Sequence, residues 1–340
     1  MKKKQVTGIV VAGIVFVAVG VFGVMSNYLA GKFADKGENS ISSFNSMMKT
    51  LDKDAAISLP ATDYIGVVNV QGTIQASSAS DSLFSAEDGY DHTLNMKFVD
   101  KMMNSDTNKG IVLYVDSPGG TVYESDELYL KLMEYKEQTG RPIWAYFGSQ
   151  ACSGGYYISM AADRVYANRN CWTGSIGVII SMTNYKGLYD KLGIKETDIT
   201  SGPNKAMGSG GIDMTEEQKA IMQSMVDEAY DQFVEIVADG RGMDDATVRK
   251  LADGRIYTAK QALENGLIDV IADYESMQAD MEDSLEGTSI TYYAPQQDNL
   301  SSLFSTFFSA YQGTREKSDA QVLSEMINDK KNGELMYYAE

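Results

Sequence analysis

The first hydrophobic feature of the chain is an uncharged apolar run from Val6 to Met25, which follows three lysines at positions 2–4. Its length of about twenty residues is enough to cross the hydrocarbon core of a bilayer, about 30 Å thick. A cleaved signal peptide would have a shorter apolar region and a small-x-small cleavage site, so the pattern favours a retained anchor. By the positive-inside rule the N-terminus is then cytoplasmic, and the chain after Met25 is extracytoplasmic.

Beyond this run, stretches with a two-residue period alternate with stretches of helical period. Clusters of β-branched and apolar residues predict strands, at 64–70, 110–116, 143–147, 165–167, 176–180 and 267–270. Apolar residues at helical spacing predict helices, at 94–103, 123–137, 153–162, 215–238 and 258–266. The longest helix opens with Thr215-Glu-Glu-Gln218, the pattern of a capping box. Such alternation is typical of an α/β fold with a mostly parallel sheet and crossover helices.

The same pattern divides the chain into four parts. Residues 1–28 contain the lysine cluster and the anchor, and the polar residues 29–60 indicate a stalk. Residues 61–285 contain the alternating strands and helices and predict one α/β domain. Residues 286–340 lose this periodicity and predict a C-terminal extension that is partly disordered, although its end, from Leu335 to Glu340, is again mostly apolar.

Composition excludes several classes of function. The 47 acidic and 29 basic residues give a net charge of −18, whereas nucleic-acid binding needs a basic face, so no nucleic-acid partner is expected. The sequence has no CxxC or HExxH motif, so neither a metal ion nor another cofactor is expected. Cys152 and Cys171 are too few for a disulfide framework and fit two small buried residues, although a bridge between them in an oxidising compartment stays open.

Three segments contain residues suited to chemistry, and the first is Asp116-Ser-Pro-Gly-Gly120 at the end of a predicted strand. Its glycines let the backbone turn sharply and leave N–H groups without side-chain cover. Such groups can stabilise a developing oxyanion by roughly 3 kcal/mol per donor in acyl transfer. A plain turn would have the same composition, so this segment alone leaves both interpretations open.

The second segment contains Ser153, which is followed by two glycines and lies between a predicted strand and a helix of small residues. A serine at such a turn is well placed for nucleophilic attack, and the N–H groups of Ser153 and Gly154 would lie at a helix N-terminus, where negative charge is favoured. Serine is also a common helix N-cap. Both interpretations stay open from the residues alone.

The third segment runs from Thr200 to Gly208 and contains Lys205, which lies in a loop outside any run of charges. Most lysines are solvated surface groups, but a lysine can act as a general base when burial lowers its pKa. A serine nucleophile needs an adjacent base, which is most often a histidine. The only histidine, His92, lies in a polar stretch without a strand end or glycine turn nearby, so Lys205 is the favoured base.

Five segments together closely resemble the signal peptide peptidase A family, in its short, single-domain bacterial type. The matching residues are Asp116-Ser-Pro-Gly-Gly120, Ser153-Gly-Gly-Tyr-Tyr157, Thr173-Gly-Ser-Ile-Gly-Val178, Ser201-Gly-Pro-Asn-Lys205 and the segment 253–269. They occur in the family's order after an N-terminal anchor, and the resemblance covers roughly residues 60–275.

This resemblance implies a serine endopeptidase with a Ser–Lys dyad, in which Ser153 is the nucleophile and Lys205 the general base. Ser175 would hydrogen-bond the lysine amine and orient it, and the backbone N–H groups of Gly120 and Gly154 would form the oxyanion hole. The implied fold is the crotonase/Clp-protease type, a parallel sheet wrapped by helices. The implied assembly is a ring- or dome-shaped homo-oligomer, an octamer, with active sites facing an inner chamber.

The substrates that the resemblance implies are remnant signal peptides, or other membrane-associated peptides, on the extracytoplasmic side of the cell membrane. Other functions stay open beside this one. They are a Clp-like Ser-His-Asp peptidase that uses His92, a crotonase-like acyl-CoA enzyme, and a catalytically inactive membrane scaffold of the same fold. The apolar end from Leu335 to Glu340 adds a further hypothesis, because it could reach an active-site groove as a substrate or a plug.

Overall fold

The computed structural model describes residues 57–76, 89–285, 291–295 and 336–338 of the 340. The chain divides into two compact units, Met1–Ala56 and Ile57–Glu340, and all described residues belong to the second. The predicted anchor, most of the predicted stalk and most of the C-terminal extension lie outside the described residues. Among the residues described, no helix combines the length and the apolar character that crossing a membrane requires.

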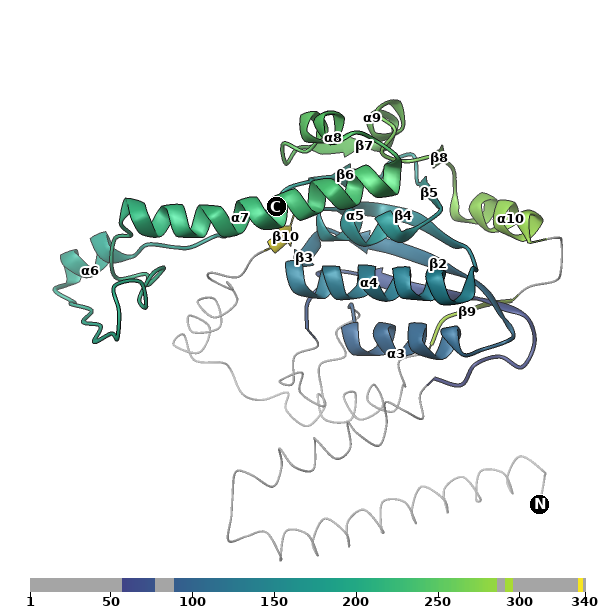
Figure 1. The fold of residues 1–340 in the computed structure, drawn as a ribbon, viewed down its shortest axis with the longest axis horizontal. Helices are drawn as coiled ribbons and strands as arrows, with labels where there is room; N and C mark the ends of the chain where they lie inside the picture. The colour runs from purple at the N-terminus through teal and green to yellow at the C-terminus, as the bar shows by residue number, and fades with distance from the viewer. Residues whose placement is uncertain (1–56, 77–88, 286–290, 296–335, 339–340) are drawn as a thin grey trace, which may run out of the picture. The chain divides into compact units, whose positions relative to one another are not determined.

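A mostly parallel sheet lies at the centre of this unit (Figure 1). Its main path follows the order β7-β6-β4-β2-β1-β9, with bounds Ile256–Thr258, Trp172–Gly174, Ile143–Cys152, Asn108–Ser117, Tyr64–Gln71 and Thr291–Tyr293. The sheet branches at β4, whose first half pairs with β5 (Arg164–Ala167) and whose last residues pair with β6. β5 in turn pairs with β8 (Val270–Ile271). Of these pairs, only β6 with β7 is antiparallel.

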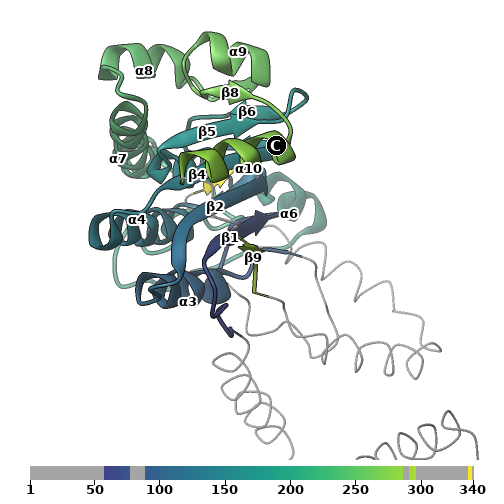
Figure 2. The same cartoon turned by 90° about the vertical axis from the view of Figure 1, so that its right-hand side faces the viewer.

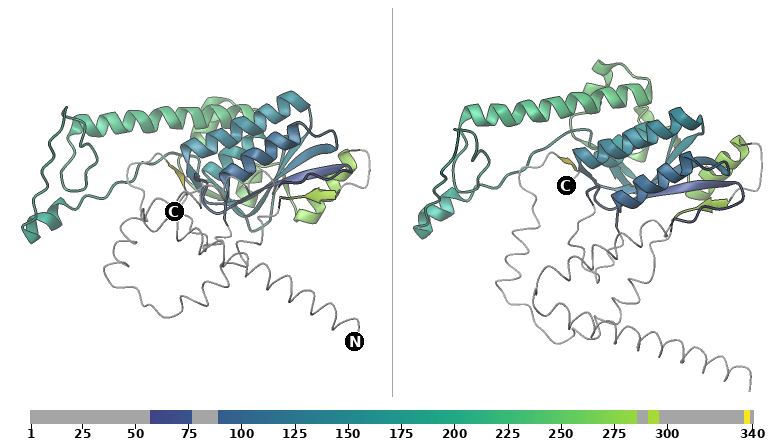
Figure 3. Two further views of the ribbon diagram at one scale, coloured as in Figure 1. Left: turned by 90° about the horizontal axis from the view of Figure 1, so that it is seen from below. Right: turned by 60° about the horizontal axis from the view of Figure 1, so that its bottom comes forward.

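The two faces of the sheet are buried in separate cores. In β2, Ile111, Leu113 and Val115 lie in the larger core, whereas Val112 lies in the smaller one, because successive side chains of a strand point to opposite faces. The larger core is covered by α3 (His92–Met103), α4 (Val122–Thr139), α5 (Gly154–Ile158) and the second half of α7 (Glu216–Arg241). Figure 3 shows α3 and α4 side by side on this face, and Figure 2 shows α10 (Tyr274–Ser284) on the other.

Most predicted elements are confirmed, because their patterns are local. The predicted capping box at the start of α7 is present, with the Thr215 hydroxyl and the Gln218 side chain each bonded to the other's backbone. The predicted helix 153–162 is α5 followed by a 3-10 turn, Ser159–Ala161. The predicted α/β fold with a mostly parallel sheet is therefore what the described residues adopt.

Two predicted strands are wrong in position. Residues 176–180 form no strand, because β6 ends before them, at Gly174. Gly174 and Ser175 have left-handed φ values of 84° and 49°, which turn the chain out of the sheet. The final strand predicted at 267–270 is the two-residue β8 instead. Within the described ranges, the sequence pattern also missed three helices and five short strands, namely α6 (Lys186–Leu192), α8 (Asp245–Leu251), α10, β3 (Gly119–Thr121), β6, β7, β9 and β10 (Met336–Tyr338).

Residues 179–228, here called the arm, extend beyond the sheet (Figure 1). Helix α6 within the arm has no buried residue, and α7 has none between Gln218 and Ala229. Several large apolar side chains of the arm are exposed, namely Ile179, Leu188, Leu192, Ile194, Ile199 and Met225. The arm therefore makes little use of its own apolar residues for packing within one chain.

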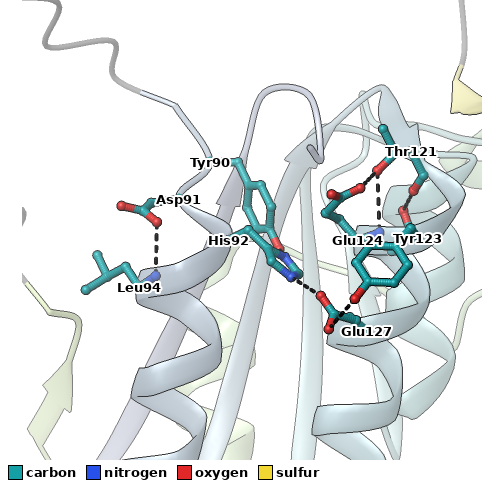
Figure 4. A network of polar contacts seen from close by, with 9 residues as sticks. Tyr90, Asp91, His92, Leu94, Thr121, Tyr123, Glu124 and Glu127 are labelled. Carbon is teal, nitrogen blue, oxygen red and sulfur yellow. Dashed lines mark hydrogen bonds and ion pairs between the residues drawn. The ribbon is translucent and has the colours of Figure 1, made fainter. Parts of the chain in front are cut away.

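The single histidine, His92, links α3 to α4 (Figure 4). His92 Nδ1 lies 2.5 Å from the Tyr90 hydroxyl, and its Nε2 lies 2.9 Å from a carboxylate oxygen of Glu127. The other oxygen of Glu127 accepts a hydrogen bond from Tyr123. Both ring nitrogens are thus occupied inside a half-buried network, which argues against His92 as the base of a Ser-His-Asp triad.

We expect the substitution His92→Ala to lower stability without lowering catalysis. It removes two hydrogen bonds and leaves the buried Tyr90 hydroxyl without this partner, so the free energy of unfolding should fall by about 1–3 kcal/mol. Urea unfolding followed by circular dichroism would measure this. The peptide hydrolysis that the family resemblance implies should match the wild type at a temperature where the variant is folded, and a loss of catalysis there would restore His92 as a candidate base.

Candidate active site

Ser153 lies at a sharp turn between β4 and α5. Its φ of 51° and ψ of −115° are rare for a residue with a β-carbon, and such strain is typical of functional sites. The turn is held by two backbone hydrogen bonds, since Ser153 N–H donates to Gly174 O at 2.8 Å and Tyr157 N–H donates to Ser153 O at 2.9 Å. A serine held on a strained strand-to-helix turn has the geometry of a nucleophile elbow.

The hydroxyl of Ser153 has no role in stabilising this turn. The residue is fully buried, and its Oγ has no hydrogen-bond partner within the described part of the chain. It occupies the N-cap position of α5, but its side chain accepts no cap hydrogen bond, so the N-cap interpretation is wrong. A buried hydroxyl without a partner costs about 1–3 kcal/mol, so a reactive role accounts for it better than a structural one.

The strand that contains Gly120 lies beside this turn. In β3 (Gly119–Thr121), Gly119 O accepts from Ile74 N–H and Thr121 N–H donates to Ile74 O, both at 2.8 Å. A β-carbon on Gly120 would overlap the Ile74 backbone, so only glycine fits here. Helix α5 packs against β3, and a β-carbon on Gly155 would lie 3.2 Å from Ser117 O. The structure thus brings the predicted oxyanion segment next to the nucleophile turn.

Ser175 lies on the other side of the same turn. It follows Gly174, whose carbonyl accepts the Ser153 N–H, and it has a left-handed φ of 49°. Its own N–H donates to Arg255 O at 2.8 Å, and its side chain is 7% exposed. No hydrogen bond of its hydroxyl occurs among the described residues, so this side chain is available to a group that enters the site.

Lys205 lies in the arm, in a loop before α7. The Gln218 side-chain amide donates to Pro203 O at 3.0 Å and holds this loop at the start of the helix. Ala229, where α7 first enters the core, is eleven residues further on, or about 16 Å along the axis. Lys205 is exposed, and its Nζ has no hydrogen bond or ion pair within the described ranges. Within a single chain, Lys205 therefore makes no hydrogen bond to Ser153.

A strand from the far end of the chain lies on the open edge of β3. Met336–Tyr338 forms β10, which pairs antiparallel with β3 so that Tyr337 lies opposite Gly120 (Figure 1, yellow). β10 also contacts the first parts of α4 and α5. Residue patterns predicted neither this strand nor the partner role of Ile74, and the only sequence signal was the apolar end after a polar extension.

The cysteines next to this site are buried thiols. Both are free, and both sulfurs donate to Trp172 O, at 3.5 Å from Cys152 and 3.3 Å from Cys171. Burial raises the pKa of each thiol to about 12, which makes both poor nucleophiles at neutral pH. Among the described residues, no group of three or more His, Cys, Asp or Glu side chains could hold a metal ion.

Comparison with known proteins agrees with this geometry. Residues 135–288 match peptidase family S49. A protein of Enterococcus faecium whose name contains signal peptide peptidase SppA is 37% identical over 80% of this chain and 79% of its own. Protease 4 of Haemophilus influenzae is 31% identical over 72% of this chain and 38% of its own, and the chloroplastic serine protease SPPA of Arabidopsis thaliana is 31% identical over 48% and 24%.

The similarity to the Enterococcus faecium protein spans most of both chains. The region that matches the family, residues 135–288, contains Ser153, Ser175 and Lys205. The strained turn at Ser153 and the glycine-containing strand β3 beside it have the geometry that a serine peptidase requires, so the structure agrees with this similarity. The chain therefore belongs to peptidase family S49 and is a serine peptidase of the signal peptide peptidase type.

Proposed function

We propose that the chain is an endopeptidase in which Ser153 and Lys205 act as a dyad across two copies of the chain. Ser153 Oγ attacks the peptide carbonyl and its proton passes to Lys205 Nζ, while the N–H groups of Gly120 and Gly154 bind the oxyanion. The protonated lysine then donates its proton to the leaving amine, and water hydrolyses the acyl-enzyme. Ser175 orients the lysine amine.

The observation that carries this proposal is the buried Ser153 hydroxyl, which has no hydrogen-bond partner among the residues that the structure describes. A serine needs an adjacent base, and the single histidine is bonded elsewhere. Lys205 lies at the exposed end of the arm, and the arm's apolar side chains lack packing partners of their own, as a surface for a neighbouring subunit would. Docking of the arm on a neighbour would dehydrate the amine, which favours the uncharged form that a base requires.

Mixing two inactive variants tests the dyad directly. Ser153→Ala and Lys205→Ala should each abolish hydrolysis of a fluorogenic peptide by the fragment after Met25. When equal amounts are mixed and allowed to exchange subunits, a site needs an intact serine from one variant and an intact lysine from the other. About one quarter of the wild-type activity should then return, since each condition holds for half of the subunits. No recovery after proven exchange would place both residues in one chain.

Peptide substrates bind as an added strand on β3. This mode uses backbone hydrogen bonds for affinity, and it suits varied sequences in extended conformation. The pairing of β10 with β3 supports it, because the same edge lies beside Ser153 and already accepts a strand of this chain. Remnant signal peptides are the proposed substrates, in line with the names of the relatives and with the predicted anchor.

The chain's own C-terminal end is a first candidate ligand for this edge. We expect intact-mass spectrometry to find wild-type protein shortened near residue 338 and Lys205→Ala protein at full length. Truncation after residue 330 should also increase the rate of peptide hydrolysis, because it removes a competing strand. Full-length masses for both proteins would argue against self-trimming, and an unchanged rate would argue against a plug.

The finer fold is proposed as the crotonase/Clp-protease type, assembled as an octamer whose sites face an inner chamber. Residues 6–25 are proposed as a single membrane anchor with a cytoplasmic N-terminus and an extracytoplasmic peptidase domain. External protease added to cells without their wall should then digest the domain and spare a reporter fused before Met1. The reverse pattern of digestion would contradict this orientation.

A further inference from the structure

The short helix after the nucleophile is held by two tyrosines that bond in different directions. α5 has only five residues, Gly154–Ile158, and it ends with Tyr156, Tyr157 and Ile158, all fully buried. The Tyr156 hydroxyl donates to Leu267 O at 2.8 Å. The Tyr157 hydroxyl donates to Asp126 Oδ1 at 2.6 Å. One tyrosine therefore ties α5 to the segment before β8, and the other ties it to α4.

The second of these links belongs to a three-residue network, Asp126, Tyr157 and Gln232, here called the Tyr157 network. Gln232 Nε2, from α7, donates to Asp126 Oδ1 at 3.0 Å and to the Tyr157 hydroxyl oxygen at 2.7 Å. The ring of Tyr157 also packs edge-on against Tyr129 of α4 and Phe233 of α7, at centroid distances of 5.5 and 5.1 Å. The network thus joins α4, α5 and α7 at one half-buried point.

The positions of these residues along the chain connect the network to both proposed oxyanion donors. Helix α4 starts directly after β3. Asp126 lies in its second turn, six residues after Gly120. Tyr157 lies three residues after Gly154. The two donors thus belong to β3 and α5, and the hydrogen bond from Tyr157 to Asp126 joins α5 to α4, the helix that continues directly from β3. A change in this bond would change the spacing of the two donors.

We propose that Asp126 is a positioning residue for catalysis, which fixes the spacing of the Gly120 and Gly154 N–H groups through Tyr157. This inference rests on the proposed function. Oxyanion donors act only when they lie about 2.7–3.1 Å from the position of the oxyanion, so small displacements weaken them. A hydrogen bond from a hydroxyl to a carboxylate is one of the stronger kinds and suits this role. Because the oxyanion exists only after attack, loss of the link lowers kcat and leaves KM unchanged.

Tyr156 supplies a control on the same helix. Tyr156→Phe removes one buried hydroxyl and its hydrogen bond to Leu267 O, whereas Tyr157→Phe removes the bond to Asp126 and the bond that Gln232 donates. A purely structural role for the Tyr157 network predicts that kcat follows Tm in both variants. A positioning role predicts that kcat falls in Tyr157→Phe by more than its loss of Tm explains, because only Tyr157 is bonded to the helix that follows Gly120.

The experiment measures Tm, kcat and KM of the oligomeric enzyme with one fluorogenic peptide, well below every Tm. Removal of an entire oxyanion donor costs about 10²–10³ in kcat, so Tyr157→Phe, which only displaces one, should lose about tenfold. Tyr156→Phe should stay within about twofold of the wild-type kcat, although its Tm also falls. Asp126→Ala should match Tyr157→Phe, whereas Asp126→Asn keeps an acceptor oxygen and should recover most of kcat.

The possible results separate this inference from the function on which it rests. Equal kcat losses in the two Phe variants, or a kcat that simply follows Tm across the set, would reduce the network to a structural role. A loss of kcat/KM in Tyr157→Phe that comes from a higher KM, with kcat unchanged, would also overturn it. If the wild-type rate survives Ser153→Ala, the proposed function itself fails, and the inference fails with it.

Discussion

The hydrogen bond from Ser153 N–H to Gly174 O is the constraint on which the site depends. It ties the turn at Ser153 to the end of β6, and so fixes the strained backbone of Ser153 against the strand that leads to Ser175. β4 makes this possible because its last residues leave β5 and pair with β6 instead. This change of partner along β4 therefore places Ser153 at the point where the strand ends and the chain turns into α5.

Around this turn, each active element enters from a different part of the chain. β3 supplies the glycine strand, the turn between β4 and α5 supplies Ser153, and Ser175 follows directly after β6. Their packing is dense, since a β-carbon at Gly120 or Gly155 would contact a neighbouring backbone closely. Lys205, the proposed base, lies apart from these elements in the arm, whose helix α6 has no buried residue. The domain therefore combines a densely packed region around Ser153 with a protruding region that contains Lys205.

The sequence predicted what depends on neighbouring residues and failed where distant segments meet. The strand at 64–70, the helix at 123–137 and the capping box at Thr215 follow from local periodicity and hydrogen bonding, and all three are present. The strand at 176–180 failed because a pair of left-handed residues, Gly174 and Ser175, ends β6 first. β9 and β10 pair with strands more than 200 positions away, and no local pattern records such partners. For the site, glycine-rich turns revealed Gly120 and Ser153, but no residue pattern states where the arm places Lys205.

The one-sided exposure of β3 has a consequence for what this enzyme can degrade. Ile74 occupies one edge of β3 and β10 pairs antiparallel with the other, so in the proposed mode of binding a substrate takes the edge that β10 takes. A chain can do so only if its own N–H and C=O groups are free of helix or sheet partners over several residues. Native domains do not offer such stretches in their interiors, so this mode of binding would favour unfolded or fragmentary polypeptides over folded mature proteins.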